Sequence, residues 1–139
     1  MLKDEGYRFM GAAFEVYNQL GYGLAEEVYQ QSLAIELELR GIPFQTKREL
    51  SVFYKQRQLS THYRPDFVVY ESMVVELKAM TELLSEHEAQ LFNYLRIARA
   101  PVGYLVNFGH KHDLQWKRLI VSNFHTPATS VAAVLAPQS

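Results

Sequence analysis

The chain has 139 residues, of which 48% are hydrophobic and 21% are charged, so its length suits one globular domain with a buried core. It contains no cysteine, which excludes disulfides, zinc–thiolate sites and a thiol nucleophile. The apolar runs are too short to span a bilayer, and the acidic residues after Met1 do not suit a signal peptide, so we expect a cytoplasmic protein without membrane contact.

The net charge of −1 conceals an uneven distribution. Residues 40–64 include six basic residues and one acidic residue, for a net charge of +5, whereas the remainder carries −6. An anionic partner on one side of the molecule would suit this asymmetry. The alternative is a solvated hairpin whose charges keep an edge strand soluble, and charge alone favours that alternative.

Two helices are predicted first along the chain. The apolar residues in 7–20 have helical spacing, and Gly21-Tyr22-Gly23 ends this helix. A second helix is predicted over 24–40, because Gly41 can terminate it and Pro43 cannot continue it.

The following residues change to the period-two pattern of strands. Residues 44–54 and 59–70 are predicted to form a hairpin around a polar turn at 55–58, and 73–79 form a third strand after the turn at Glu71-Ser72. A helix is predicted over 85–99, with Ser85 as its N-cap, and Pro101 ends it. Strands at 102–108 and 114–122 follow.

The predicted order, α-α-β-β-β-α-β-β, indicates an α/β fold with one mixed sheet flanked by helices. The third strand, the next helix and the fourth strand would form a right-handed βαβ unit. One domain is expected over residues 1–122. The small and polar residues over 123–139 predict a flexible C-terminal tail.

Three charged residues interrupt predicted strands that are otherwise apolar. Asp66 lies in the second strand, and Glu76 and Lys78 lie in the third. Because residues 76 and 78 are two apart on a strand, their side chains share one face of the sheet. The turn between the strands sets Asp66 nearly opposite position 76 or 77, so we expect the two carboxylates to meet.

Two carboxylates and a lysine on a partly covered sheet face lose contact with water, which costs free energy unless a partner compensates their charge. Carboxylate oxygens suit Mg²⁺ or Mn²⁺, and the lysine could polarise a water or neutralise charge on a phosphate. Such a site could hydrolyse a phosphodiester with a metal. The alternative is an ion pair of Lys78 with Asp66 or Glu76, and the residues alone favour neither interpretation.

Two further pairs lie on predicted helices. Gln90 and Tyr94 are four residues apart, so they share a helix face and can hydrogen-bond a phosphate oxygen. Alternatively, Gln90 is a surface residue and Tyr94 borders the core. Glu26 lies in the first turn of the second helix, where the helix dipole favours a carboxylate. It could instead face the metal, supported by Tyr29.

Taken together, these residues resemble a known family. Four motifs carry the resemblance, and they are Gly23-x-x-Glu26-x-x-Tyr29, Pro65-Asp66-Phe67, Glu76-Leu77-Lys78 and Gln90-x-x-x-Tyr94. They look like the motifs of the GxxExxY family in the PD-(D/E)XK nuclease-like superfamily. The similarity extends over residues 7–122 and includes the strand end Leu105-Val106-Asn107-Phe108-Gly109.

The resemblance implies an αβββαβ core and Mg²⁺-dependent hydrolysis of DNA or another nucleic acid. Asp66, Glu76 and the Leu77 carbonyl would bind the metal. Lys78 would act on the attacking water or on the scissile phosphate. Glu26 would face the metal directly or through water.

The resemblance also selects Glu26 over its neighbour Glu27, because of the spacing from Gly23. Gln90 and Tyr94 would correspond to the Q-x-x-x-Y element of RecB-type nucleases.

The basic segment could contact phosphates beyond the scissile one, through Arg64, Lys47, Arg48, Lys55 and Arg57. The sequence has no helix-turn-helix or zinc-finger pattern, so we expect recognition of structure or ends before recognition of base sequence. His110-x-His112-Asp113 resembles a chelate but lacks a third strong ligand, so it is not expected to bind a metal.

The leading hypothesis is a Mg²⁺-dependent nuclease, and the alternative is a non-catalytic module that binds nucleic acid or protein through the same face. Cleavage distinguishes the two. Replacing Asp66 or Lys78 by Ala should abolish cleavage and leave folding largely intact. Apolar positions on the first helix would also suit a homodimer.

Overall fold

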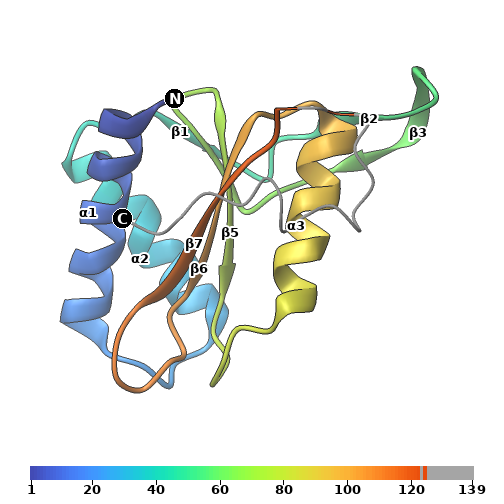
Figure 1. Ribbon diagram of the computed structural model, residues 1–139. Helices are drawn as coiled ribbons and strands as arrows, with labels where there is room; N and C mark the ends of the chain where they lie inside the picture. Colours follow the sequence, from blue (N-terminus) through green and yellow to red (C-terminus); the bar gives the residue numbers. More distant parts are fainter. Residues whose placement is uncertain (123, 125–139) are drawn as a thin grey trace.

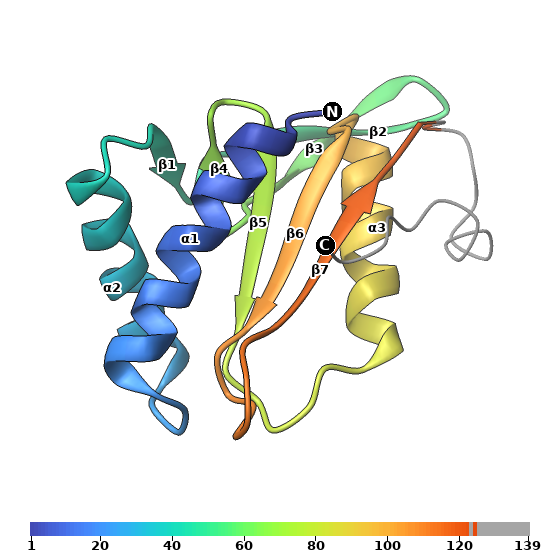
Figure 2. The same ribbon diagram turned by 60° about the vertical axis from the view of Figure 1, so that its left-hand side comes forward.

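The computed structural model describes residues 1–122 and 124, so the tail predicted over 123–139 lies outside the described residues apart from residue 124. A five-stranded sheet lies between two layers of helices, with α1 and α2 on one face and α3 on the other (Figures 1 and 2). The helices are α1 (Lys3–Leu20), α2 (Glu26–Leu39) and α3 (Ser85–Ala98). None of these helices is long and apolar enough to cross a membrane, as judged over the described residues.

The central sheet is mixed. Its strands, in spatial order, are β1 (Phe44–Thr46), β4 (Phe67–Val69), β5 (Met73–Lys78), β6 (Val102–Asn107) and β7 (Gln115–Ile120). The neighbours β5 and β6 are parallel and are connected by α3, whereas the other pairs are antiparallel. This sheet confirms the predicted α/β fold with helices on both faces.

The prediction of two long strands before Met73 is wrong, because both are interrupted. Lys47 has a φ of 54°, which turns the chain between β1 and β2 (Leu50–Tyr54). Pro65 has no N–H for a sheet ladder and lies between β3 (Arg57–Tyr63) and β4. The Lys47 N–H donates to the Asp66 carbonyl at 3.4 Å, so the two interruptions lie side by side.

These interruptions divide the predicted hairpin into two parts. The strands β1 and β4 pair within the central sheet, whereas β2 and β3 pair only with each other. Figure 1 shows the β2–β3 hairpin projecting from the body of the molecule on the side of α3. Its tip is formed by Lys55 and Gln56, both with positive φ, as a two-residue turn of the type I′ class requires.

The end of α2 agrees with the prediction. Gly41 has a φ of 68°, and the Ile42 N–H donates to the Leu37 carbonyl at 3.0 Å, which is a Schellman motif. The predicted N-cap of α3 is wrong. Ser85 is the first helical residue, and the His87 ring nitrogen Nδ1 accepts the Leu84 N–H at 3.1 Å.

Two separate cores cover the sheet. On one face, α1 and α2 pack through residues such as Phe9, Tyr29 and Leu33, none of which is exposed. On the other face, α3 packs through Phe92 and Leu95 together with side chains of the β2–β3 hairpin. The central strands β5 and β6 contribute to both cores, and for this reason they are apolar on both faces.

Candidate functional site

The β4–β5 hairpin brings Asp66 and Glu76 together. Phe67 pairs with Val75, so Asp66, which directly precedes β4, lies opposite Glu76. The Asp66 N–H donates to Glu76 Oε1 at 2.8 Å, and the Leu77 N–H donates to Asp66 Oδ2 at 2.8 Å. Each carboxylate therefore binds the backbone of the other strand, and the meeting expected from the sequence is observed.

The other oxygen of Asp66 binds groups that the sequence did not suggest. Asp66 Oδ1 accepts from the Gln30 side-chain amide and from the Lys47 ammonium, both at 3.0 Å. Gln30 lies on α2 and Lys47 follows β1 directly, so one carboxylate connects three elements. Only the folded chain could show these contacts, because positions 30, 47 and 66 are far apart in sequence.

Lys78 does not form the ion pair that was the alternative to a metal site. Within the described residues, its ammonium has no carboxylate partner at ion-pair distance. Lys78 and Glu76 are two residues apart on β5 and so lie on the α3 face of the sheet. Lys78 lies near two carboxylates but pairs with neither, so its ammonium is available to act on a bound molecule.

The first turn of α2 places Glu26 near this group. Burial raises the pKa of Glu26, the negative charge of Asp66 raises it further, and Lys78 and Lys47 lower it. Tyr29 supports the preceding turn, because its hydroxyl donates to the Gly21 carbonyl at 2.6 Å. Glu26 thus approaches the site from α2, on the opposite side of the sheet from α3.

Glu76 is the most perturbed carboxyl of the site. Burial raises its pKa to about 7, and the charge of Asp66 raises it as well. The Asp66 N–H, Lys78 and the hydroxyl of Tyr63 act in the opposite direction. Glu76 therefore resists ionisation next to Asp66, and a cation bound beside it would stabilise its charged form.

Tyr63 is a residue of the site that the sequence did not indicate. It is the last residue of β3, and its hydroxyl is buried next to Glu76. Its ring stacks on Tyr94 of α3, with centroids 4.2 Å apart. An aromatic residue at a strand end is common, so nothing in the sequence marked Tyr63.

The two residues predicted on α3 have different surroundings. Tyr94 is partly exposed and reaches the site by stacking on Tyr63, which lies beside Glu76. Gln90 is exposed one turn earlier on the same helix, and its side chain makes no hydrogen bond with the described residues. Gln90 thus faces solvent, whereas Tyr94 is connected to the carboxylates.

The basic residues predicted to bind nucleic acid are not gathered in one patch. Arg64 forms an ion pair with Glu49, and Arg48 donates to the Gln45 side chain at 3.1 Å. Lys55 and Arg57 lie at the tip of the β2–β3 hairpin, which projects from the body (Figure 1). Of these five residues, Lys47 alone contacts a carboxylate of the candidate site.

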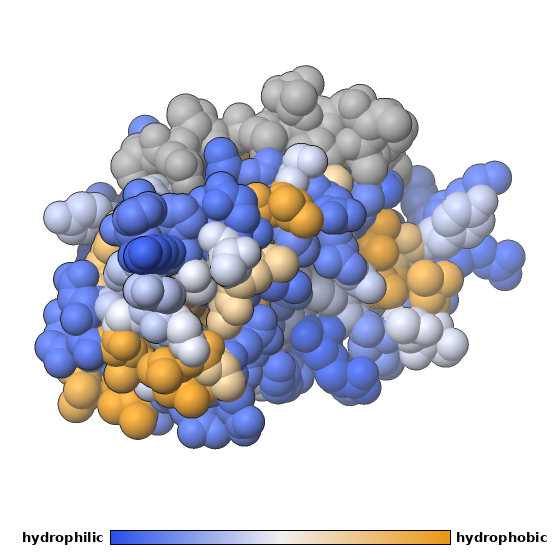
Figure 3. All heavy atoms as spheres, turned by 90° about the horizontal axis from the view of Figure 1, so that it is seen from below, coloured by the Kyte–Doolittle hydropathy of each residue, from blue (hydrophilic) through white to orange (hydrophobic). Residues whose placement is uncertain are grey.

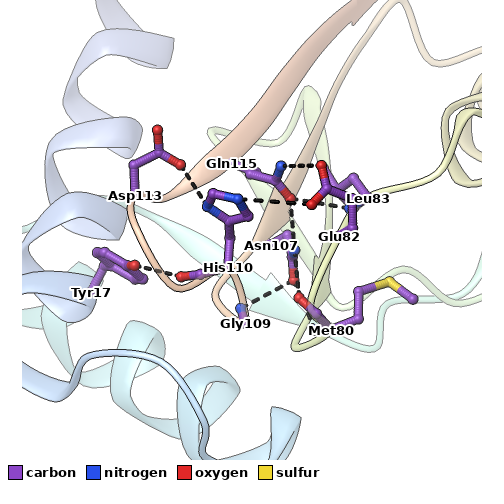
Figure 4. A network of polar contacts seen from close by, with 9 residues as sticks. All are labelled: Tyr17, Met80, Glu82, Leu83, Asn107, Gly109, His110, Asp113 and Gln115. Carbon is purple, nitrogen blue, oxygen red and sulfur yellow. Dashed lines mark hydrogen bonds and ion pairs between the residues drawn. The ribbon is translucent and has the colours of Figure 1, made fainter.

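A buried polar network fixes the loop that follows Lys78 (Figure 4). The Asn107 side chain, fully buried at the end of β6, accepts the Met80 N–H at 2.9 Å and donates to the Met80 carbonyl at 2.8 Å. It also donates to Gln115 Oε1 at 3.0 Å. Asn107 on β6 in this way holds the backbone two residues beyond Lys78, the last residue of β5.

The first histidine of the pair after β6 lies beside two acidic side chains. His110 Nδ1 lies 2.8 Å from Asp113 Oδ1, and His110 Nε2 lies 3.8 Å from Glu82 Oε2 (Figure 4). The described residues contain no group of three or more His, Asp or Glu side chains already arranged to hold a metal.

The donor set around Asp66 nevertheless fits a hard divalent cation. Asp66 and Glu76 supply carboxylate oxygens, which Mg²⁺ and Mn²⁺ prefer. The Lys47 ammonium shows that Asp66 Oδ1 already accepts a cationic partner at 3.0 Å. Glu26 is a third carboxylate close enough for Asp66 to raise its pKa.

Comparisons with known proteins identify the family and a similar fold. A family model described as "PD-(D/E)XK nuclease superfamily" matches residues 3–119. A solved structure described as "Crystal structure of SSO0001" has a TM-score of 0.55 at 18% identity over 77% of this chain, so it shows similarity of fold alone. The match covers 54% of that chain, so this chain spans about half its length. No curated protein matches the chain.

Proposed function

Because the chain belongs to the PD-(D/E)XK nuclease superfamily, we propose that it is a metal-dependent nuclease that hydrolyses phosphodiester bonds of nucleic acid, with DNA as the first candidate substrate. The observation that carries the proposal is the pairing of Asp66 with Glu76 beside a lysine that has no ion-pair partner in the described structure. Membership in the GxxExxY family, through Gly23, Glu26 and Tyr29, is part of the same proposal.

In this proposal, Asp66 and Glu76 hold a Mg²⁺ or Mn²⁺ ion, with the Leu77 carbonyl as a further ligand. Glu26 binds it directly or through water. The ion would lower the pKa of a bound water and stabilise negative charge on the phosphate. Asp66 is held by backbone and side-chain hydrogen bonds from three elements, so its position is preorganised.

Lys78 is the proposed catalytic cation. It lies two residues from Glu76 on the same face of β5, so its ammonium can approach the attacking water or the scissile phosphate. A positive charge placed where a phosphate gains negative charge stabilises the transition state. Within the described residues no carboxylate neutralises Lys78, so its charge is available for this role.

The remaining predicted residues would bind substrate. Gln90 and Tyr94 on α3 would hydrogen-bond phosphate oxygens. Phosphates farther along the strand would contact the dispersed basic residues, namely Arg64, Lys47, Arg48, Lys55 and Arg57. The cytoplasmic location and the homodimer expected from the sequence stay predictions.

Cleavage of end-labelled DNA and RNA, single-stranded and duplex, tests the proposal in Mg²⁺ and in Mn²⁺, with a chelator as the blank. We expect Lys78→Met to lower the cleavage rate by about 100-fold, the usual effect of losing one group that stabilises transition-state charge. Asp66→Asn should lower it at least as much, because it removes a charged metal ligand.

A matched pair of variants on α2 makes this test sharper. Glu26→Gln should reduce cleavage, whereas Glu27→Gln should not, because Glu27 is exposed and only accepts a hydrogen bond from Gln31 at 3.2 Å. Equal losses in both variants would count against a role for Glu26. Metal-independent cleavage, or full activity of both Asp66→Asn and Lys78→Met, would refute the proposal.

A second candidate function is a binding module, and the surface around Glu26 favours it. Leu20, Tyr22, Leu24 and Val28 are exposed large apolar residues at the junction of α1 and α2. Seen from this end, apolar side chains gather at one corner beside a mostly hydrophilic surface (Figure 3). Such a patch suits a protein partner. Binding of a protein partner at this patch, with no cleavage of nucleic acid at any metal concentration, would support this candidate.

A further inference from the structure

A cavity lies on the opposite face of the sheet from Glu76 and Lys78. It has a volume of about 820 Å³ and is bordered by α1, by the segment after α2 and by β6 and β7. Tyr104, Trp116 and Arg118 reach it from the two strands, on the face that α1 covers. Its volume is within the usual range of small-molecule sites.

The base of this cavity contains a buried cation without a counter-charge. Arg118 is 7% exposed. Its Nε donates to the Tyr104 hydroxyl at 3.1 Å and its Nη2 donates to the Met1 carbonyl, and both acceptors are neutral. No carboxylate pairs with Arg118 within the described residues. A buried guanidinium without an anion is costly, and an anionic ligand would offset that cost.

The rim adds positive charge and aromatic surface. Lys3 and Arg8 line the cavity, are exposed, and have no ion-pair partner in the described part of the chain. Tyr7 is 82% exposed on the same turn of α1, and Trp116 forms part of the opposite wall. Cationic groups that alternate with flat apolar rings suit a ligand with both a negative charge and a planar ring.

We propose that this cavity binds a small organic anion that carries an aromatic ring, with Arg118 as the buried contact of the anionic group. Arg8 and Lys3 hold the same charge from the rim, and Tyr7 and Trp116 contact the ring. The anion is a phosphate monoester or a carboxylate, which share the oxygen acceptors that a guanidinium binds. This site goes beyond the proposed nuclease function and does not depend on it.

The chain supplies its own probe, because Trp116 is the only tryptophan in the sequence. Tryptophan fluorescence, with calorimetry as a second method, is followed during titration with AMP and with benzoate, in the presence of a chelator. We expect a saturable response to at least one of them. Adenosine has the aromatic ring but no phosphate, and inorganic phosphate has no ring. Each should therefore bind at least 10-fold more weakly than AMP.

Variants assign the response to this cavity. Arg118→Gln should weaken binding at least 10-fold. Because Arg118 is buried and this variant could fail to fold, Arg8→Gln on the exposed rim gives a second test, with an expected loss of about 3-fold. Lys111→Gln, an exposed lysine outside the cavity, is the matched control and should change nothing.

The outcomes separate this site from the nuclease site. Asp66→Asn should leave the Trp116 response unchanged, even if it abolishes cleavage. Loss of the response in Asp66→Asn would place AMP at the carboxylates and overturn the proposal. The absence of a saturable response to both AMP and benzoate, or equal binding of AMP and adenosine, would also overturn it.

Discussion

At the scale of single residues, Asp66 combines a structural and a chemical role. Its carboxylate accepts hydrogen bonds from Gln30, Lys47 and the Leu77 N–H, so it connects α2, the end of β1 and β5. Its side chain is 13% exposed, so water replaces these partners poorly. The residue proposed to bind metal therefore also holds the site together.

This double role changes the expected effect of substitutions at Asp66. Asp66→Ala leaves the Leu77 N–H without its partner and should lower the free energy of unfolding by about 1–3 kcal/mol. Asp66→Asn keeps an acceptor oxygen and should cost less than half as much. Urea unfolding of the metal-free proteins measures both. Equal stability of the two variants would contradict this role, and cleavage should be tested in Asp66→Asn.

Glu76 predicts a pH dependence of stability in the metal-free protein. Its pKa in the folded state is raised from the model-peptide value of 4.5 to about 7, so the folded state binds the proton more tightly than the unfolded state does. The contribution of the Glu76 carboxyl to the free energy of unfolding is therefore fully present below pH 4.5 and is lost as the pH rises through 7. By the linkage constant the loss is about 3 kcal/mol at most.

Glu76→Gln is the matched variant for this pH dependence. It should be more stable than the wild type at pH 8 and close to it at pH 4.5, because the amide stays neutral at both pH values. Thermal unfolding in a chelator between pH 4.5 and 8 measures the difference. The groups that face Glu76 are Asp66, Lys78 and Tyr63, and all three are unchanged in the variant. A constant difference across this range would contradict the prediction.

At the scale of elements, the network around Asn107 determines where β5 ends and how the chain proceeds to α3. Its side chain makes hydrogen bonds to Met80, Gly109 and Gln115 (Figure 4). Gly109 approaches the Met80 backbone so closely that a Cβ would lie 2.3 Å from the Met80 nitrogen. The backbone that follows Lys78 is thus fixed, whereas the Lys78 side chain forms no ion pair among the described residues.

Asn107→Leu should destabilise the protein by about 3 kcal/mol or more. The substitution keeps the branching of the side chain but leaves the partly buried Met80 N–H and carbonyl without partners. Urea unfolding measures the loss, and hydrogen exchange at the Met80 amide should accelerate. Lys111→Gln, in the exposed loop next to this network, is the control and should change stability by less than about 0.5 kcal/mol.

At the scale of the whole molecule, the candidate site lies where two cores meet. The carboxylates lie on the sheet, Glu26 comes from the layer of α1 and α2, and Tyr94 comes from the layer of α3 (Figure 2). Each layer packs on its own apolar core. Bringing the site residues together therefore requires that both cores be formed, and unfolding of either layer would separate them.

Metal binding should accordingly stabilise the whole fold. Mg²⁺ or Mn²⁺ at 100 times its dissociation constant should add about 3 kcal/mol to the free energy of unfolding, because the ion binds the folded state only. Thermal unfolding and titration calorimetry measure the effect. Asp66→Asn should abolish the stabilisation, and Glu27→Gln should preserve it. Equal stabilisation of the wild type and Asp66→Asn would place the ion elsewhere.

Much of this protein follows from local patterns in its sequence. Helical spacing and Gly41 predicted the first two helices, because these signals act within a few residues of each other. The meeting of Asp66 with Glu76 also followed from the sequence, because a short turn sets the register of a hairpin. The motifs that resemble the nuclease family depend on the same short spacings.

Tertiary structure alone decided the remaining features. The positive φ of Lys47 interrupted a predicted strand, and the sheet then paired β1 with β4. The stacking of Tyr63 on Tyr94, the contact of Lys47 with Asp66 and the burial of Arg118 join positions that lie far apart in sequence. Such contacts depend on which layers pack together, and local propensity carries no information about that packing.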